Sequence, residues 1–69
     1  MNLSIVIPVF NESESLNILS DEICLVLSKL EYSYEIIFID DGSTDKSWDI
    51  IQSLSFNNNI KAIRFKKNI

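Results

Sequence analysis

YEIIFIDDGSTD, residues 34–45, is the stretch that decides the fold of this 69-residue chain. Its residues 36–39 are apolar at every position, so a strand built from them is apolar on both faces. Strands of this kind are typical of parallel sheets that are buried on both sides. The polar end of the stretch is a turn, in which Gly42 is free to take a positive φ. We therefore predict a central strand that ends in an acidic turn.

The segments around this stretch alternate between strand and helix patterns. Their apolar periodicities predict strands over 3–9, 34–40 and 60–65, and helices over 13–30 and 44–55. Such alternation implies parallel strands joined by right-handed crossovers. If both crossovers step the same way, the strand order is 3-2-1 and both helices lie on one face, which is the arrangement we predict. The fold class is thus α/β, a three-stranded parallel βαβαβ unit. Nothing in the chain covers its second face, and we expect self-association through that face.

Local signals predict where the two helices begin. Asn11 and Glu14 have the spacing of a capping box, which starts the first helix near residue 13. Ser43 or Thr44 is the predicted cap of the second helix.

The composition is globular, with 46% hydrophobic and 23% charged residues. The chain has no His, which excludes His-based acid–base catalysis and His metal sites within it. Its single Cys, Cys24, cannot form an internal disulfide and is expected to be a buried apolar residue. A net charge of −4 argues against a nucleic-acid-binding surface. One Gly is too few for a dinucleotide-binding fingerprint or a P-loop.

Two polar segments follow the first two predicted strands, and we expect them to form the site. They are Pro8–Glu12 (PVFNE) and an acidic turn, residues 40–43 (DDGS). Ligands of open parallel sheets bind beyond the carboxyl ends of the strands, so the two segments should face each other there. Phe10 offers ring contact to a base, carboxylates accept N–H and O–H donors, and a helix N-terminus favours phosphate. Simpler roles stay open: Phe10 in the core, Glu12 as partner of a helix dipole, and the two Asp as turn formers.

SIVIPVFNE (residues 4–12) and EIIFIDDGSTD (residues 35–45) together resemble the N-terminal signature of inverting family 2 glycosyltransferases with a GT-A fold. The tighter resemblance is to polyprenyl-phosphate sugar transferases of the dolichyl-phosphate mannose synthase type. It covers essentially the whole chain. It implies that residues 1–69 are the truncated N-terminal, nucleotide-binding half of a Rossmann-like GT-A domain.

The resemblance also implies roles for individual residues. Asp41 corresponds to the carboxylate that contacts the base, and Phe10 replaces a common Tyr. The implied nucleotide-sugar-binding set is Pro8, Phe10, Asn11, Glu12, Asp40, Asp41 and Ser43, with Asp40 and Ser43 supporting the turn. The family's Asp-x-Asp, which holds Mg²⁺ or Mn²⁺, and its acceptor base lie further on, so the chain supplies no catalytic residue and no metal ligand. Ile69 ends the chain where the family has Phe.

The activity that the resemblance implies is transfer of a sugar from a UDP- or GDP-sugar to a polyprenyl phosphate or a saccharide, in cell wall or glycan biosynthesis. We expect the 69-residue chain alone to be inactive. It lacks a signal peptide or an apolar run of ~20 residues, so we expect a soluble segment, cytoplasmic and at the cytoplasmic face of a membrane in the full-length protein.

Alternatives remain open at this point. The acidic pair is also compatible with a receiver-like or phosphatase-like Mg²⁺-binding module, and the chain with a non-catalytic remnant. Trp48 is expected in the core. A basic cluster of Lys61, Arg64, Lys66 and Lys67 is either a solvated strand edge or a counter-charge for phosphates.

Overall fold

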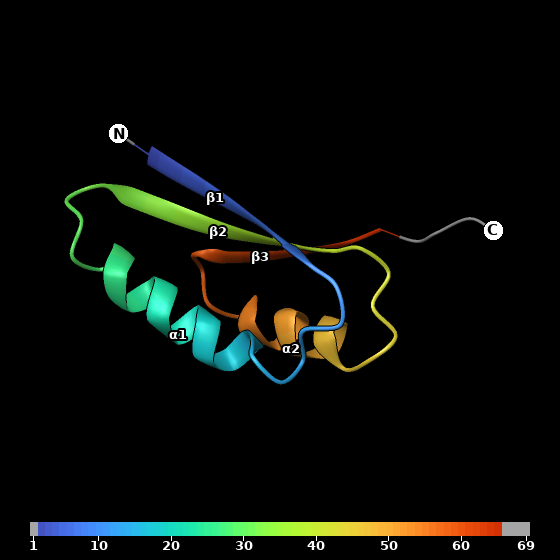
Figure 1. Ribbon diagram of the computed structural model, residues 1–69. Helices are drawn as coiled ribbons and strands as arrows, with labels where there is room; N and C mark the ends of the chain where they lie inside the picture. Colours follow the sequence, from blue (N-terminus) through green and yellow to red (C-terminus); the bar gives the residue numbers. More distant parts are fainter. Residues whose placement is uncertain (1, 66–69) are drawn as a thin grey trace.

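Strands and helices alternate along the chain in the computed structural model, which describes residues 2–65. The strands are β1 (Asn2–Val9), β2 (Ser33–Asp40) and β3 (Ile60–Arg64), and the helices are α1 (Leu16–Leu27) and α2 (Ser47–Leu54). β2 lies between β1 and β3 and is parallel to both. Both helices lie on the same side of the sheet (Figure 1). The predicted α/β fold class, strand order and placement of the helices are confirmed.

The register brings the carboxyl ends of the three strands to one edge of the sheet. Val9 of β1 pairs with Asp40 of β2, which pairs in turn with Arg64 of β3. The connections that follow β1 and β2 therefore begin at the same edge of the sheet. We call this the carboxyl edge.

The core lies between the sheet and the helices. Alternate residues of β2 point toward the helices, and Ile36 and Phe38 are fully buried there. The buried apolar residues are Val9, Leu16, Leu27, Ile36, Phe38, Ile51 and Ile60. Trp48 and Cys24, both expected to be buried, are partly buried and pack against this cluster.

Neither helix covers the other face of the sheet (Figure 1). We call this the open face. On it, Val6 of β1 pairs with Ile37 of β2, and Ile39 of β2 pairs with Ile63 of β3. Val6 is 55% exposed and Ile63 is 44% exposed. β2 is therefore apolar on both faces, as predicted, although the described residues bury only one of them.

We expect the isolated 69-residue chain to self-associate through the open face, because exposed apolar patches of this kind are removed from water by association. Val6→Lys puts a charge at the centre of this face and should shift the chain toward the monomer in sedimentation velocity. Leu25→Lys is the matched control, because Leu25 is exposed on α1 and lies away from the open face. A monodisperse monomer formed by the unsubstituted chain would contradict the prediction.

The predicted bounds of the first helix, 13–30, were wrong at both ends. Asn11 and Glu14 do not form a capping box, and Ser15 precedes the helix without a side-chain cap bond. Residues 12–16 instead form a turn in which Glu12 O accepts from the amides of Ser15 and Leu16. At the other end, Lys29 N and Leu30 N donate to carbonyls three residues back, so residues 28–30 form tight turns rather than α-helix.

The second helix was also predicted too long, over 44–55 rather than Ser47–Leu54. Neither Ser43 nor Thr44 caps it. Its first amide, Ser47 N, donates instead to Asp45 Oδ1 over 2.8 Å. The side chain of Ser43 and the amide of Thr44 are both engaged with Asn11, as described below, and this contact between the two connections sets the start of the helix.

Candidate functional site

The Pro8–Glu12 segment and the acidic turn lie against each other at the carboxyl edge. Asp41 N donates to Val9 O over 2.9 Å, and Asn11 N donates to Ser43 Oγ over 2.9 Å. One residue further, Glu12 N donates to Ser47 Oγ over 2.8 Å. The predicted juxtaposition of the two segments is confirmed. In all three hydrogen bonds, a backbone amide is the donor.

Asn11 fastens the two segments together. Its φ of 51° is in the left-handed region, which Asn tolerates better than most residues. In this conformation, Oδ1 of the Asn11 side chain accepts hydrogen bonds from Thr44 N over 2.8 Å and from Asp45 N over 3.3 Å. The side-chain oxygen of Asn11 is thus engaged within the protein, where it orients the last part of the β2–α2 connection, just before α2.

Asp40 and Ser43 face inward. Asp40 is fully buried, and its Oδ1 accepts from Ser43 N over 3.2 Å, which closes the acidic turn around Gly42. Asp40 O also accepts from Phe65 N over 2.9 Å, so the end of β2 is tied to the end of β3. These contacts connect the acidic turn to the ends of β2 and β3.

The other predicted site residues present their side chains to solvent. Asp41 is exposed between the inward-facing Asp40 and Ser43. Pro8, Phe10 and Glu12 are exposed at the same edge, on the neighbouring segment. The arrangement therefore offers an aromatic ring and two carboxylates on a framework built by buried polar groups.

Asp45 and Ser47 also build this framework, and sequence analysis did not select them. Asp45 Oδ2 accepts from Ser13 N over 3.2 Å, and its Oδ1 accepts from Ser47 N. Hydrogen bonding from Ser47 is the main cause that lowers the pKa of Asp45 from 3.8 to about 2. The Asp-x-Ser spacing of residues 45–47 is the local signal that predicts the bond to Ser47, because Asp commonly bonds the amide two residues on. No local signal predicts the bond to Ser13.

The lowered pKa of Asp45 makes stability depend on pH in a defined window. The carboxylate form contributes stability that is fully present above the ordinary pKa of 3.8 and is lost as pH falls through the folded value of about 2. We expect Asp45→Asn to flatten the fall of the melting temperature between those two pH values. Asp49→Asn removes another exposed acid, in the first turn of α2, and serves as the control. An identical pH profile for Asp45→Asn and the unsubstituted chain would contradict the assignment.

The described residues do not fit a divalent cation. Within residues 2–65, no group of three or more His, Cys, Asp or Glu side chains lies close enough together to hold a metal ion. Asp40, one of the acidic pair, directs its oxygens at Ser43 N and at the Arg64 guanidinium, 3.6 Å away. The pair is therefore not arranged as the ligand set that a receiver-like or phosphatase-like module requires.

A hollow beside the site is unsuited to phosphate. It lies at the start of α1 and is lined by Asn11, Glu12, Ser13, Glu14, Ser15 and Asp45. Three of its lining residues are acidic, and the amide of Ser13 is already bonded to Asp45. The expectation that this helix N-terminus favours phosphate is opposed by that charge.

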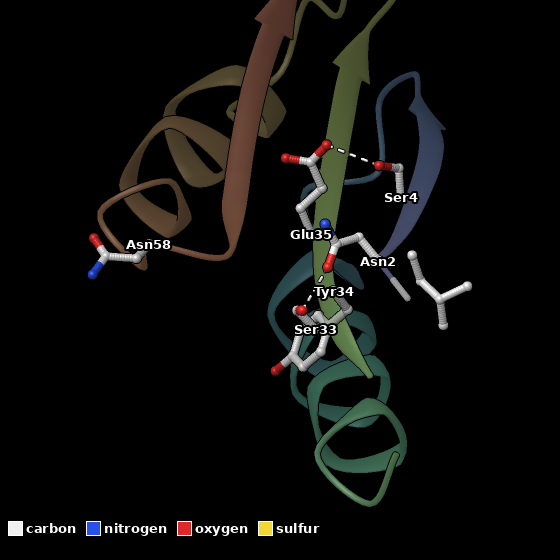
Figure 2. A pocket seen from close by; sticks show the side chains of 7 residues that line it. Asn2, Ser4, Ser33, Tyr34, Glu35 and Asn58 are labelled. Carbon is white, nitrogen blue, oxygen red and sulfur yellow. Dashed lines mark hydrogen bonds between the residues drawn. The ribbon is translucent and has the colours of Figure 1, made fainter. Parts of the chain in front are cut away.

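A second hollow, of about 450 Å³, lies at the opposite edge of the sheet, where the strands begin (Figure 2). It is lined by Asn2, Leu3, Ser4, Ser33, Tyr34, Glu35 and Asn58. Ser4 Oγ donates to Glu35 Oε1 over 2.9 Å, and Ser33 Oγ donates to Asn2 Oδ1 over 2.6 Å. Four of its polar side chains are bonded in these two pairs, and the hollow contains none of the predicted site residues.

The basic cluster is divided in the structure. Lys61 Nζ lies 3.0 Å from Glu35 Oε2, and this contact lowers the pKa of the Glu35 carboxyl. Arg64 pairs with Asp40 at the other end of β3. Lys66, Lys67 and Ile69 lie outside the described residues. Each of the two described basic residues of the cluster is thus paired with an acid.

No helix within residues 2–65 is long and apolar enough to cross a membrane. The longer of the two, α1, has 12 residues, where a membrane span needs roughly 20.

Comparison with known proteins adds to this geometry. The model of the family described as glycosyl transferase family 2 matches residues 4–68. An undecaprenyl-phosphate 4-deoxy-4-formamido-L-arabinose transferase of Photorhabdus laumondii is 45% identical over 49 residues, which are 71% of this chain and 15% of that protein. The protein of the same name from Yersinia pestis (strain Pestoides F) is 49% identical over 49 residues, with the same coverage. An uncharacterized glycosyltransferase of Synechocystis is 39% identical over 69 residues, 99% of this chain and 22% of that protein. The chain therefore spans between 15% and 22% of the length of these relatives.

Proposed function

The chain belongs to glycosyl transferase family 2, and from that membership we propose that residues 1–69 form the nucleotide-binding part of a sugar transferase's donor site. The donor is a UDP- or GDP-sugar. The acceptor is a polyprenyl phosphate or a saccharide. The proposal takes this chain as one half of a GT-A domain, the half that holds the nucleotide.

One observation carries the proposal: the Pro8–Glu12 segment and the acidic turn are hydrogen-bonded together at the carboxyl edge. α1 and β2 separate the two segments along the chain, so only the fold brings them together. Open parallel sheets bind nucleotides at this edge. Asp41, Phe10 and Glu12 are exposed there, and Asp40, Ser43 and Asn11 hold the turns through hydrogen bonds.

The chemistry of each exposed group suits one part of a nucleoside. The Asp41 carboxylate accepts an N–H of the base, because uracil and guanine both carry ring N–H donors. The ring of Phe10 packs against the base or ribose. Glu12 accepts from ribose hydroxyls, and Pro8 lines the pocket with an apolar surface that has no N–H of its own.

The leaving diphosphate needs a separate source of positive charge. In transferases of this kind Mg²⁺ or Mn²⁺ supplies it, by stabilising the charge that develops on the leaving group. Within residues 2–65, no group of three or more His, Cys, Asp or Glu side chains could hold such an ion, and we propose that this part of the chain binds the nucleoside rather than the diphosphate.

The acceptor is proposed from the relatives. Two of those described above are named undecaprenyl-phosphate sugar transferases. A polyprenyl phosphate acceptor would place the reaction at a membrane surface, and we propose the cytoplasmic face, where nucleotide sugars are made.

The test is a transfer assay on the complete polypeptide that contains residues 1–69. It is incubated with a panel of UDP- and GDP-sugars, Mn²⁺ and undecaprenyl phosphate, and the lipid fraction is examined for attached sugar. We expect product from one donor, greatly reduced product from Asp41→Asn, and unchanged product from Asp21→Asn, which alters an exposed acid on α1. The 69-residue chain alone should give none, because the resemblance places the metal ligands for the diphosphate and the base for the acceptor further along the family's sequence. Product from the chain alone that disappears in Asp41→Asn would show that the catalytic centre lies within residues 1–69.

A further inference from the structure

Arg64 ends β3 at the carboxyl edge and touches two residues from other elements. Its Nε lies 3.6 Å from Asp40 Oδ2 on β2, and its guanidinium carbon lies 5.6 Å from the centre of the Trp48 ring on α2. The second distance is within the range of a cation–π contact. Arg64 therefore joins β3, β2 and α2 behind the acidic turn.

The contact with Arg64 matters for Asp40 because Asp40 is buried. Its side chain is fully buried, and Oδ2 has no hydrogen-bond donor among the described residues. At 3.6 Å the Arg64 guanidinium is an ion-pair partner rather than a hydrogen-bond donor. A buried carboxylate without a compensating charge is strongly unfavourable, so the conformation of Asp40 depends on Arg64.

Hydrogen bonds connect Asp40 to the exposed part of the site. Its other oxygen, Oδ1, accepts from Ser43 N, and Ser43 Oγ accepts from Asn11 N. Asp41 lies between Asp40 and Ser43, so its direction is set by how those two residues are held. A chain of contacts thus runs from Arg64 through Asp40 and Ser43 to the Pro8–Glu12 segment.

We propose that Arg64 is a positioning residue for the nucleotide site: it compensates the charge of buried Asp40 and so fixes the turn that presents Asp41. This role rests on the proposed function. It differs from a counter-charge for phosphates, because the guanidinium is held between Asp40 and Trp48.

The test measures binding of UDP and of GDP by calorimetry in the complete polypeptide, with folding of each variant checked by circular dichroism. Arg64→Met keeps much of the side chain's apolar length and removes its charge, and we expect it to weaken nucleotide binding roughly tenfold. Arg64→Lys should restore most of the affinity, since it restores the charge. Lys61→Met is the matched control, because it removes a charge from the same strand at the far end.

A double variant separates positioning from direct contact. In an Asp40→Asn background no charge is left to compensate, so Arg64→Met should have little further effect. Equal losses in both backgrounds, or no loss from Arg64→Met alone, would overturn the positioning role while leaving the proposed function in place.

A readout without nucleotide keeps the two proposals apart. The Ser43 amide should exchange its hydrogen faster in Arg64→Met than in the unsubstituted protein, and Lys61→Met should leave its exchange unchanged. Unchanged exchange in Arg64→Met would overturn the inference about Arg64. Failure of the unsubstituted protein to bind either nucleotide would overturn the proposed function and the nucleotide role of Arg64, while the exchange result would still decide whether Arg64 holds the turn.

Discussion

Asp41→Asn is expected to weaken binding of the donor nucleotide by roughly ten- to hundredfold, the loss that follows when a charged acceptor becomes a neutral one. Asn has the shape of Asp, and the Asp41 amide keeps its bond to Val9 O, so the acidic turn should stay in place. The loss would thus report on the carboxylate itself. Calorimetry with UDP and with GDP measures it in the complete polypeptide.

The control for this measurement is Asp21→Asn, which makes the same change on the exposed surface of α1. It should bind as the unsubstituted protein does. Equal affinity in the Asp41 and Asp21 variants would remove Asp41 from the site. The proposal for the base-contacting residue would then have to move to Glu12, the other exposed carboxylate of the two segments.

Phe38→Ala is expected to lower the free energy of unfolding by about 3–5 kcal/mol, which is typical when a fully buried aromatic side chain is truncated. Phe38 is 0% exposed. It lies in β2, the central strand, and its side chain points toward the helices. Small domains are only marginally stable, so this cost should leave the 69-residue chain largely unfolded. Urea denaturation followed by circular dichroism measures it.

Phe56→Ala makes the same substitution at a side chain that is 90% exposed, just beyond α2. Its effect should lie within about 0.5 kcal/mol of zero. Similar losses from the two substitutions would contradict the placement of the core between sheet and helices.

The strands could be predicted from the sequence because their signals are local. Residues 36–39 are apolar at every position, which favours a central parallel strand wherever it lies in the chain. The alternation of strand and helix patterns predicts parallel strands with right-handed crossovers, and the strand order follows once both crossovers step the same way, as they do here. The helix bounds failed for a different reason. The first helix begins later than predicted because the amides of Glu12 and Ser13, which precede it, donate to Ser47 and Asp45 of another connection, whereas local capping rules assume a partner nearby.

The position of the site followed from the carboxyl-edge rule, but its internal structure did not. Asn11 was predicted as a cap for its own helix, and instead it bonds to residues 44 and 45, more than thirty positions away. Arg64 was predicted as a solvated or phosphate-facing charge, and it lies against a buried carboxylate. Such contacts depend on how segments that are distant in sequence meet in space. The spacing of residues along the chain does not predict which of these side chains will be in contact.

Hydrogen exchange of the complete polypeptide, with and without saturating UDP or GDP, tests most directly the claim that the nucleotide binds at the carboxyl edge. The account predicts protection confined, within this chain, to peptides that contain residues 8–12 and 40–44. Protection instead at residues 2–4 and 33–35, which line the hollow at the opposite edge (Figure 2), would contradict it.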